Sequence, residues 1–302
     1  TELGINWQSK FHEFSKFASK AASLGQVHKA QSKKNKIQLA CKLQYPDMES
    51  TISADLKQLK LILKIYKQIE STINTEEIYM ELRERLYEEV DYKNEVKNIL
   101  LYKYIFNKNN NIIIPEPYKD LSTERLICMD WLEGEPLTKY YDSSQETRNC
   151  IASNLFNAWY FPFYKYGIIH GDPHPGNYTI TDNGKKINLL DFGCIRSFNP
   201  SFVSGVIKLY KALVKNDKKM ATEAYKIWGF RNLNNKLVEA LNVWALYLYG
   251  PLLEDRIRKI QNHQGASYAK ELLSKVRKEL KKYGGVKPPR EFVLVDRAAI
   301  GL

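Results

Sequence analysis

The sequence predicts an α+β fold with two lobes, a small N-terminal lobe with strands and a long helix, and a mostly helical C-terminal lobe. Apolar and polar residues alternate over residues 37–44, as in a half-buried strand. A helical period covers residues 75–106, and the apolar stripes after residue 199 are all helical. We place the boundary so that residues 1–131 form the N-lobe and residues 132–302 the C-lobe.

The composition provides enough apolar residues for these lobes and favours anionic partners. The 302 residues are 44% hydrophobic, which is sufficient for a core. Lys plus Arg outnumber Asp plus Glu by 46 to 34, so that the net charge is +12. Such a balance favours nucleotides, nucleic acid or an anionic membrane, although it also serves solubility. Of these partners, we do not expect nucleic acid.

Cysteine spacing and the lack of long apolar runs predict a soluble protein of a reducing cytosol. The four cysteines are too far apart for a metal-binding pair and too few for a disulfide framework: Cys41, Cys128, Cys150 and Cys194. No run reaches the roughly 18 apolar residues of a membrane span, and the start lacks the apolar core of a signal peptide. Because the chain starts without Met and stops inside an apolar stretch, we expect a piece of a longer polypeptide.

Residues 20–30 are the first candidate for contact with a nucleotide, as a strand, a loop and a second strand. Before them, aromatic residues with helical spacing predict packing against the next segment of the chain: Trp7, Phe11, Phe14 and Phe17. The loop has only one glycine, and its alanines disfavour positive φ, so it would hold a nucleotide in a different pose from a glycine-rich loop. Alone, the segment also fits a simple strand entry. The candidate contacts are Ala21, Ala22, Ser23, Gly25 and Gln26.

Lys42 lies on the strand at residues 37–44, on the face opposite the apolar set. A lysine at this place suits the α- and β-phosphates of a nucleotide, whereas a lone strand lysine is more often solvated. Pro46 ends the strand. The next helix then has an apolar stripe made of Ile52, Leu56, Leu59, Leu63 and Tyr66.

The helical pattern at residues 75–106 carries three carboxylates of interest. At ~100° per residue, Asp91 and Glu95 share a face one turn apart, and Glu89 lies about a third of the way round. One carboxylate could therefore pair with Lys42 while another points elsewhere into a cleft. Charged helix faces are mostly just solvated, which is the alternative interpretation.

A linker between the lobes is predicted after the strand at residues 125–129. Gly134 and Pro136 interrupt an apolar run there, and the backbone from Asp130 to Leu132 could meet the edge of an adenine. A plain loop would explain the same residues. Ser144 is then the expected N-cap of a helix that continues beyond residue 158 and ends at Gly167.

The segment His170-Gly171-Asp172-Pro173-His174-Pro175-Gly176-Asn177 has the order in which kinase-like enzymes place a base and a metal ligand. Asp172 would orient or deprotonate the attacking hydroxyl or water. Asn177 and Asp191 would hold a divalent cation, because oxygen ligands suit the hard ion Mg²⁺. The alternative is a loop of turn formers in which the aspartates serve as caps.

The residues after this loop predict a hairpin and then helices. Asn183-Gly184 is a hairpin signal between two apolar runs, and the hairpin would return Asp191 toward Asn177. Asn199-Pro200 then starts a helix. No Ala-Pro-Glu comes after Asp191, so an activation segment for peptide substrates is not evident. Lysines at residues 215–219 and 275–282 lie on amphipathic helices, where solvated faces are the default interpretation.

Taken together, these segments resemble the UbiB-like (AarF-type) atypical kinase family over nearly the whole chain. The matching segments are residues 21–28 for its alanine-rich loop, 40–46 for its lysine strand, 89–91 for its Glu-x-Asp motif, 170–177 and 191–193 for its catalytic and metal loops, and 297–299 for its terminal helix. Glu95 matches the ion-pair partner of the lysine, Lys42. The chain departs from the family at Lys20, where an alanine is usual, and it lacks the Lys-x-Gly-Gln helices that cover the family's active site.

The resemblance implies a bilobed protein-kinase-like fold that binds ATP or ADP with magnesium or manganese. It also implies a role in ubiquinone biosynthesis at a membrane, with ubiquinone-biosynthesis proteins and a lipid or prenyl-quinone precursor as partners. The expected location is cytoplasmic, peripheral on the inner membrane. Two alternatives stay open, namely a small-molecule kinase of the aminoglycoside or choline kinase type, and a pseudokinase whose nucleotide gates the binding of a lipid or protein.

Overall fold

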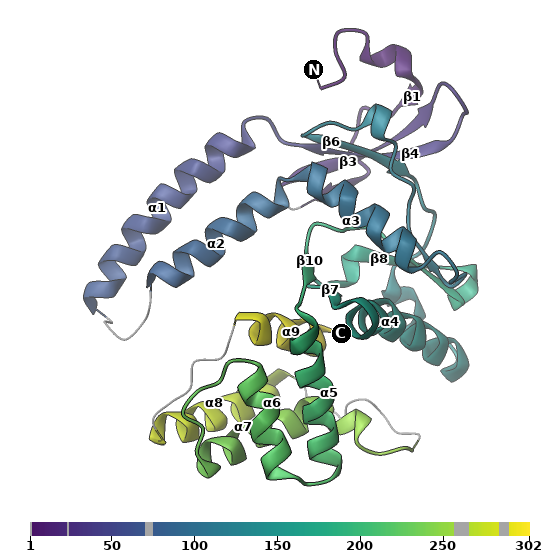
Figure 1. The fold of residues 1–302 in the computed structure, drawn as a ribbon. Helices are drawn as coiled ribbons and strands as arrows, with labels where there is room; N and C mark the ends of the chain where they lie inside the picture. Colours follow the sequence, from purple (N-terminus) through teal and green to yellow (C-terminus); the bar gives the residue numbers. More distant parts are fainter. Residues whose placement is uncertain (1, 23, 70–74, 257–265, 284–289) are drawn as a thin grey trace. The chain divides into compact units, whose positions relative to one another are not determined.

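The computed structural model describes residues 2–22, 24–69, 75–256, 266–283 and 290–302 (Figure 1). The chain forms two compact units, each of which is described by itself. The first consists of Thr1–Leu155 with His174–Ile195, and the second of Phe156–Pro173 with Arg196–Leu302. The lobe boundary between residues 131 and 132 remains a prediction.

The first unit contains an antiparallel five-stranded sheet in the order β1-β3-β4-β6, with β2 also paired to β3. Its strands are β1 (Phe11–Phe14), β2 (Lys20–Ala22), β3 (Gly25–Ser32), β4 (Gln38–Gln44) and β6 (Leu126–Asp130). Strand β4 lies between β3 and β6, and its side chains alternate between two faces as predicted. The strand is not half-buried, however, because Glu95 and Val90 contact the face of Lys42 and Gln44, so that both faces are buried. Leu39 and Cys41 lie in an apolar core on one face, and Lys42 points to the other.

The N-terminal aromatic residues do not form the helix that their spacing resembles. A 3-10 helix, η1 (Trp7–Lys10), leads directly into β1, whose backbone pairs with β3. Trp7, Phe11 and Phe14 still pack together, with ring centroids 5.2–6.2 Å apart. Phe17 is 85% exposed and does not join them. Strand pairing therefore overrode the helical period, while the predicted packing of the first three rings is present.

The long helix expected over residues 75–106 is two helices. After α1 (Met48–Ile69), the chain forms α2 (Thr75–Glu89) and α3 (Tyr92–Ile105), and Figure 1 shows α1 and α2 side by side. The break lies at Val90-Asp91, because the Asp91 carboxylate accepts a hydrogen bond from the Asn94 N–H at 2.9 Å and caps α3. An N-cap residue has non-helical backbone angles, so the apolar period continues while the helix does not.

A second, three-stranded sheet in the first unit has the order β5-β9-β8. It consists of β5 (Ile112–Ile113), β8 (Tyr178–Thr181) and β9 (Lys186–Leu189). The predicted hairpin is confirmed, since β8 pairs with β9 in antiparallel register. Its turn contains Asn183 and Gly184 at φ of 51° and 92°, the left-handed region that these residue types tolerate. Short 3-10 helices are η2 (Lys119–Leu121), η3 (Leu137–Tyr140), η4 (Pro175–Asn177) and η5 (Asp182–Gly184).

The second unit is mostly helical, as predicted. Its elements are the C-terminal half of α4 (Gln145–Tyr166), β7 (Ile168–His170), most of β10 (Ile195–Ser197), α5 (Pro200–Val214), α6 (Lys218–Ile227), α7 (Asn235–Tyr249), η6 (Gly250–Leu252), α8 (Ala266–Lys282) and α9 (Arg290–Gly301). Gly167 ends α4 at φ 70°, and Pro200 opens α5 after Asn199, as expected. Within the described ranges, no helix has both the length and the apolar character needed to cross a membrane.

Candidate functional site

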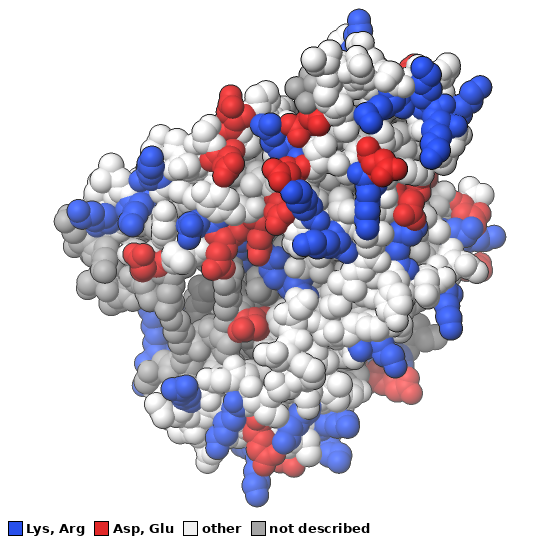
Figure 2. Space-filling model, turned by 45° about the horizontal axis from the view of Figure 1, so that its top comes forward, with Lys and Arg blue, Asp and Glu red and all other residues white. Residues whose placement is uncertain are grey.

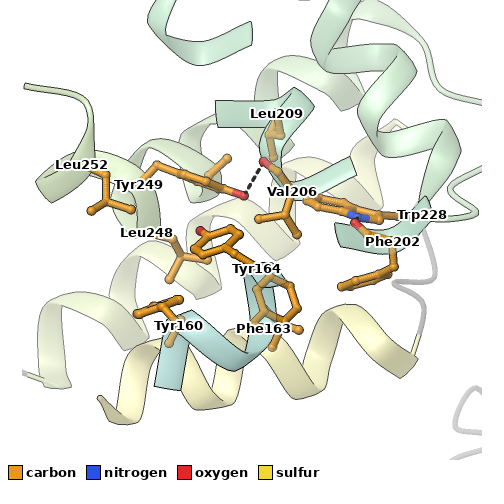
Figure 3. Close-up of a pocket in the computed structure, with 13 residues that line it drawn as sticks. Tyr160, Phe163, Tyr164, Phe202, Val206, Leu209, Trp228, Leu248, Tyr249 and Leu252 are labelled. Carbon is orange, nitrogen blue, oxygen red and sulfur yellow. Dashed lines mark hydrogen bonds between the residues drawn. The ribbon is translucent and has the colours of Figure 1, made fainter. Parts of the chain in front are cut away.

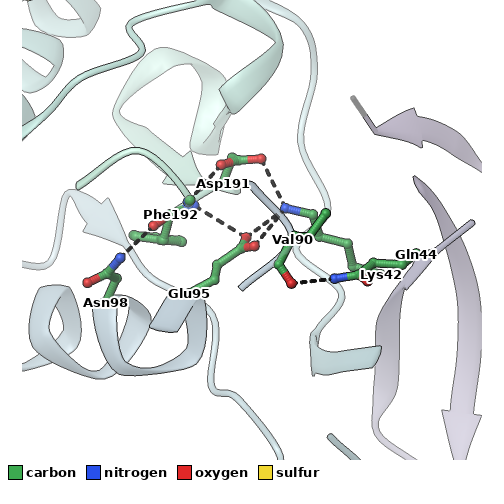
Figure 4. Close-up of polar contacts among 8 residues, drawn as sticks. Lys42, Gln44, Val90, Glu95, Asn98, Asp191 and Phe192 are labelled. Carbon is green, nitrogen blue, oxygen red and sulfur yellow. Dashed lines mark hydrogen bonds and ion pairs between the residues drawn. The ribbon is translucent and has the colours of Figure 1, made fainter. Parts of the chain in front are cut away.

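Lys42 lies between two carboxylates in the first unit (Figure 4). Its Nζ atom is 2.7 and 2.9 Å from the two carboxylate oxygens of Glu95, and 3.1 Å from Oδ2 of Asp191. The Lys42 side chain is 10% exposed and that of Glu95 only 2%. The lysine is therefore not the solvated strand lysine that sequence statistics favour, and the predicted contact with Glu95 is present.

Burial and charge act in opposite directions on this cluster. Burial alone would lower the pKa of Lys42, but the carboxylates of Glu95 and Asp191 raise it well above its ordinary value, so the lysine is charged at neutral pH. Burial raises the pKa of Glu95 against the opposing effect of Lys42. The ammonium also lies 5.3 Å from the ring centroid of Tyr92, a further contact that favours its cationic form.

The backbone around Asp191 holds its carboxylate in place. Oδ1 of Asp191 accepts a hydrogen bond from the Gly193 N–H at 3.0 Å. The next residue, Phe192, is fully buried, and its carbonyl oxygen accepts from the Asn98 side chain of α3 at 2.9 Å. Sequence reasoning missed Asn98, because nothing in its local pattern indicates a partner 94 residues away. Helix α3 thus supplies both Glu95 and the amide that fixes the Asp-Phe-Gly segment.

Asn177 is tied to the residue before Asp191. Its carbonyl oxygen accepts from the Leu190 N–H at 2.9 Å, and η4 positions it just before β8. The side-chain amide of Asn177 and the carboxylate of Asp191, which is 34% exposed, supply oxygen ligands of the kind that bind Mg²⁺ or Mn²⁺. These residues fit the predicted divalent cation. No group of three or more His, Cys, Asp or Glu side chains suited to a metal occurs among the described residues.

The alanine-rich segment forms a hairpin of β2 and β3. Ala21 pairs with Gln26 and Ala22 with Gly25, while Ser23 lies outside the described residues. A Cβ added at Gly25 would lie 2.2 Å from the Leu43 carbonyl oxygen. Glycine is therefore required here by the close approach to β4, whatever it contributes to phosphate contact.

The Glu89-Val90-Asp91 segment forms the break between α2 and α3. The Gln44 side chain donates to the Val90 carbonyl oxygen at 2.6 Å, so strand β4 holds this turn two residues beyond Lys42. Asp91 is the cap described above, and Glu89 ends α2. A capping role explains Asp91 without a ligand, and its predicted functional role stays a prediction.

Backbone hydrogen bonds hold the start of the predicted linker on both sides. The N–H groups of Asp130 and Trp131 donate to the Glu116 and Gln38 carbonyl oxygens, at 3.0 and 2.9 Å. Contact with an adenine edge would therefore fall to their carbonyl oxygens or to Leu132. A Cβ at Gly134 would lie 2.5 Å from the Thr179 hydroxyl oxygen, so the chain lies directly on β8 here.

Asp172 belongs to the second unit, just after β7. Its N–H donates to Nδ1 of the buried His170 at 3.2 Å, which shapes the turn that presents the carboxylate. The His170 carbonyl oxygen in turn accepts from the Trp159 indole of α4 at 3.0 Å. The loop of Asp172 is thus anchored through a buried histidine.

A family model described as "ABC1 atypical kinase-like domain" matches residues 1–225. The chain belongs to this family. The predicted resemblance to UbiB-like (AarF-type) atypical kinases is confirmed, since ABC1 relatives include "Atypical kinase COQ8, mitochondrial" of Saccharomyces cerevisiae, 30% identical over 222 residues, 74% of this chain and 44% of that protein. "Probable serine/threonine-protein kinase abkA" of Dictyostelium discoideum is 30% identical over 230 residues, 72% of this chain and 40% of that protein.

A solved structure from Mycobacterium tuberculosis, titled "The complex structure of Rv3197-erythromycin", has a TM-score of 0.66 and 22% identity to this ABC1 chain. The match covers all of this chain and 81% of the Mycobacterium tuberculosis chain, which supports the predicted kinase-like fold class. The chain spans less than half the length of the two curated relatives above, 44% of the Saccharomyces protein and 40% of the Dictyostelium protein. Some relatives are named as mitochondrial and others as chloroplastic.

Proposed function

We propose that this chain is an atypical kinase or ATPase that binds ATP or ADP with magnesium or manganese. Lys42 would contact the α- and β-phosphates, and Glu95 would hold the lysine in position. Asn177 and Asp191 would hold the cation, which supplies neutralisation of the phosphate charge when bound. Asp172 would orient, or accept a proton from, the hydroxyl or water that attacks the γ-phosphate.

The contact of Lys42 with Glu95 and Asp191 is the single observation that carries the proposal. These three side chains together bear one positive and two negative charges in a largely buried place. A nucleotide adds phosphate charge, which a carboxylate repels until a cation lies between them. The excess carboxylate therefore favours a cation that accompanies the nucleotide, rather than a nucleotide alone.

Replacing Asp191 by Asn tests this assignment. We expect wild-type protein to gain thermal stability with ATP or ADP only when Mg²⁺ is present, and the Asp191→Asn variant to lose that metal-dependent gain. The measurement is the shift in melting temperature with nucleotide, with and without Mg²⁺. Asp182→Asn, an exposed carboxylate in the η5 turn, is the matched control and should respond as the wild type. Equal stabilisation of the Asp191 variant at matched Mg²⁺ contradicts the proposal.

Single-turnover phosphate release separates an enzyme from a nucleotide-gated binding protein. With Asp172→Asn, we expect nucleotide binding to remain and release of γ-phosphate to fall at least a hundredfold, the scale of a lost general base. If wild-type protein releases no phosphate while binding nucleotide normally, the pseudokinase alternative replaces catalysis.

We further propose that the protein supports ubiquinone biosynthesis at an anionic membrane and is a poor protein kinase. Figure 2 shows Lys and Arg interspersed with Asp and Glu over the visible face, and Lys218 pairs with Glu239 at 2.9 Å. A few exposed lysines still contribute about 1 kcal/mol each near anionic lipid. We expect ATPase activity to rise with cardiolipin-containing liposomes. Unchanged ATPase activity with efficient phosphorylation of a generic peptide would contradict both parts.

A further inference from the structure

Tyr92 borders the cluster of Lys42, Glu95 and Asp191 without belonging to any of its ion pairs. It is the first residue of α3, directly after the cap Asp91, and only 2% of it is exposed. The centroid of its ring lies 5.3 Å from Nζ of Lys42. The ring is therefore a wall beside the lysine of the proposed nucleotide site.

The hydroxyl of Tyr92 reaches the hairpin of β2 and β3. A Cβ added at Gly25 would lie 3.1 Å from this hydroxyl oxygen. Gly25 pairs with Ala22 at the end of the hairpin where its two strands meet. Both residues belong to the segment that the sequence predicts to contact a nucleotide. Tyr92 thus lies between this hairpin and Lys42, two parts of the chain that were assigned to the same ligand.

This hydroxyl makes no hydrogen bond to any residue that the structure describes. Tyrosines of the second unit do have such partners. The Tyr249 hydroxyl donates to the Val206 carbonyl oxygen at 3.2 Å (Figure 3), and the Tyr225 hydroxyl donates to Oδ1 of Asn242 at 2.9 Å. A buried hydroxyl without a partner costs stability, and phenylalanine would fill the same space without that cost. The hydroxyl of Tyr92 therefore calls for a partner outside the described residues.

The chemistry of that partner follows from the protonation of the phenol. Burial raises the pKa of Tyr92 above its ordinary value of 10.0, and the opposing effect of Lys42 does not cancel this shift. The hydroxyl consequently keeps its proton at neutral pH and can donate it. An ionised phosphate oxygen accepts hydrogen bonds and is a strong partner for such a donor.

We propose that Tyr92 is a further phosphate-binding residue, whose hydroxyl donates a hydrogen bond to a phosphate oxygen of the nucleotide while its ring positions Lys42. This role rests on the proposed nucleotide site. The phenol is a neutral donor, so it contacts phosphate without adding charge to a cluster that already contains one ammonium and two carboxylates.

Tyr92→Phe removes only the hydroxyl and tests the phosphate contact. The ligand is Mg–ADP or Mg–ATP, whichever the wild-type full chain binds more tightly by calorimetry. Its Kd should rise at least about fivefold in the variant, because a hydrogen bond to a charged acceptor is lost. Tyr225→Phe also removes a buried hydroxyl, but in the second unit, and should bind as the wild type. An unchanged Kd in Tyr92→Phe, or an equal rise in both variants, overturns the contact.

Phosphorus NMR separates a phosphate contact from a purely structural role of the hydroxyl. The ³¹P resonances of the bound nucleotide should differ between the wild type and Tyr92→Phe, and should coincide between the wild type and Tyr225→Phe. A disturbed hairpin could lower affinity without this difference. Coincident resonances in all three proteins therefore overturn the contact even if the affinity of Tyr92→Phe falls.

Tyr92→Leu removes the ring as well and tests the positioning of Lys42. Its Kd for the same nucleotide should exceed that of Tyr92→Phe at least about threefold, because the ammonium loses its contact with an aromatic face. Tyr92→Met serves the same purpose if the leucine variant does not fold. An equal Kd in the phenylalanine variant and in the aliphatic one overturns the role of the ring.

Failure of the proposed function gives a different result from failure of this role. If the wild type binds neither Mg–ADP nor Mg–ATP, the nucleotide site and the role of Tyr92 are both overturned. If the wild type binds nucleotide and the Tyr92 variants bind it equally well, only the role of Tyr92 is overturned.

Discussion

Two lysine–glutamate ion pairs, with lysines on neighbouring strands, have the same N–O distance but very different exposure to water. Lys42 on β4 and Lys29 on β3 each place Nζ 2.7 Å from a glutamate oxygen, of Glu95 and Glu133 respectively. The first pair is 10% and 2% exposed, and the second 38% and 76%. Because water screens the second pair and not the first, equal distances do not mean equal energies.

The buried pair of Lys42 and Glu95 also contacts a third charged side chain. Asp191 adds a second carboxylate to Lys42, so that these three groups carry a net negative charge. Burying charge costs free energy that a structural pair recovers only with good geometry. The second carboxylate beside Lys42 is the feature on which the proposed cation rests.

The largest expected effect comes from removing one carboxylate of each pair. Glu95→Ala leaves a buried ammonium with only Asp191 and should lower the free energy of unfolding by about 3–5 kcal/mol. Glu133→Ala should lower it by less than about 1 kcal/mol. Urea denaturation of both variants measures the difference. Similar losses in the two variants would mean that burial does not separate these pairs.

The sequence predicted the members of the buried cluster but not the side chains that support it. The alternation around Lys42 and the spacing from Asp172 to Asn177 to Asp191 are local patterns, so they can be read without a structure. Asn98 acts through a residue far along the chain, and only the folded backbone brings the two together.

The helix break at Val90-Asp91 shows a second limit of sequence patterns. The apolar period continues across it, so periodicity predicted one helix where Asp91 caps the start of a new one. The strand β1 shows the same limit in reverse, because pairing with β3 determined its conformation. In both places, a contact between distant segments prevailed over a local period.

A smaller effect on stability is expected when both charges of the buried pair are removed together. In Lys42→Met/Glu95→Leu, apolar side chains of similar length replace the ions, and unfolding free energy should stay within about 2 kcal/mol of the wild type. Stabilisation by nucleotide with Mg²⁺ should nevertheless be lost. Urea denaturation and thermal shift measure the two properties. A double variant as unstable as Glu95→Ala would indicate that the pair serves stability rather than binding.

The smallest expected effect is the pH dependence of the exposed pair. The hydrogen bond from Lys29 lowers the pKa of Glu133 below its ordinary value of 4.5, against the opposing effect of desolvation. A lowered pKa in the folded state gives stability that is complete above the ordinary value and is lost as pH falls through the lowered one.

Glu133→Gln removes this titration and keeps the size of the side chain. At pH 7 we expect the wild type to be more stable than the variant by less than about 1 kcal/mol, and by less still in 1 M salt. The difference should disappear on acidification below the lowered pKa of Glu133, as measured by urea denaturation across pH. Glu133 also accepts a hydrogen bond from the Trp131 indole at 2.8 Å. Glutamine keeps an oxygen that can accept this N–H, so the comparison isolates the charge. A difference that persists at low pH and high salt would therefore contradict charge pairing with Lys29 as its cause.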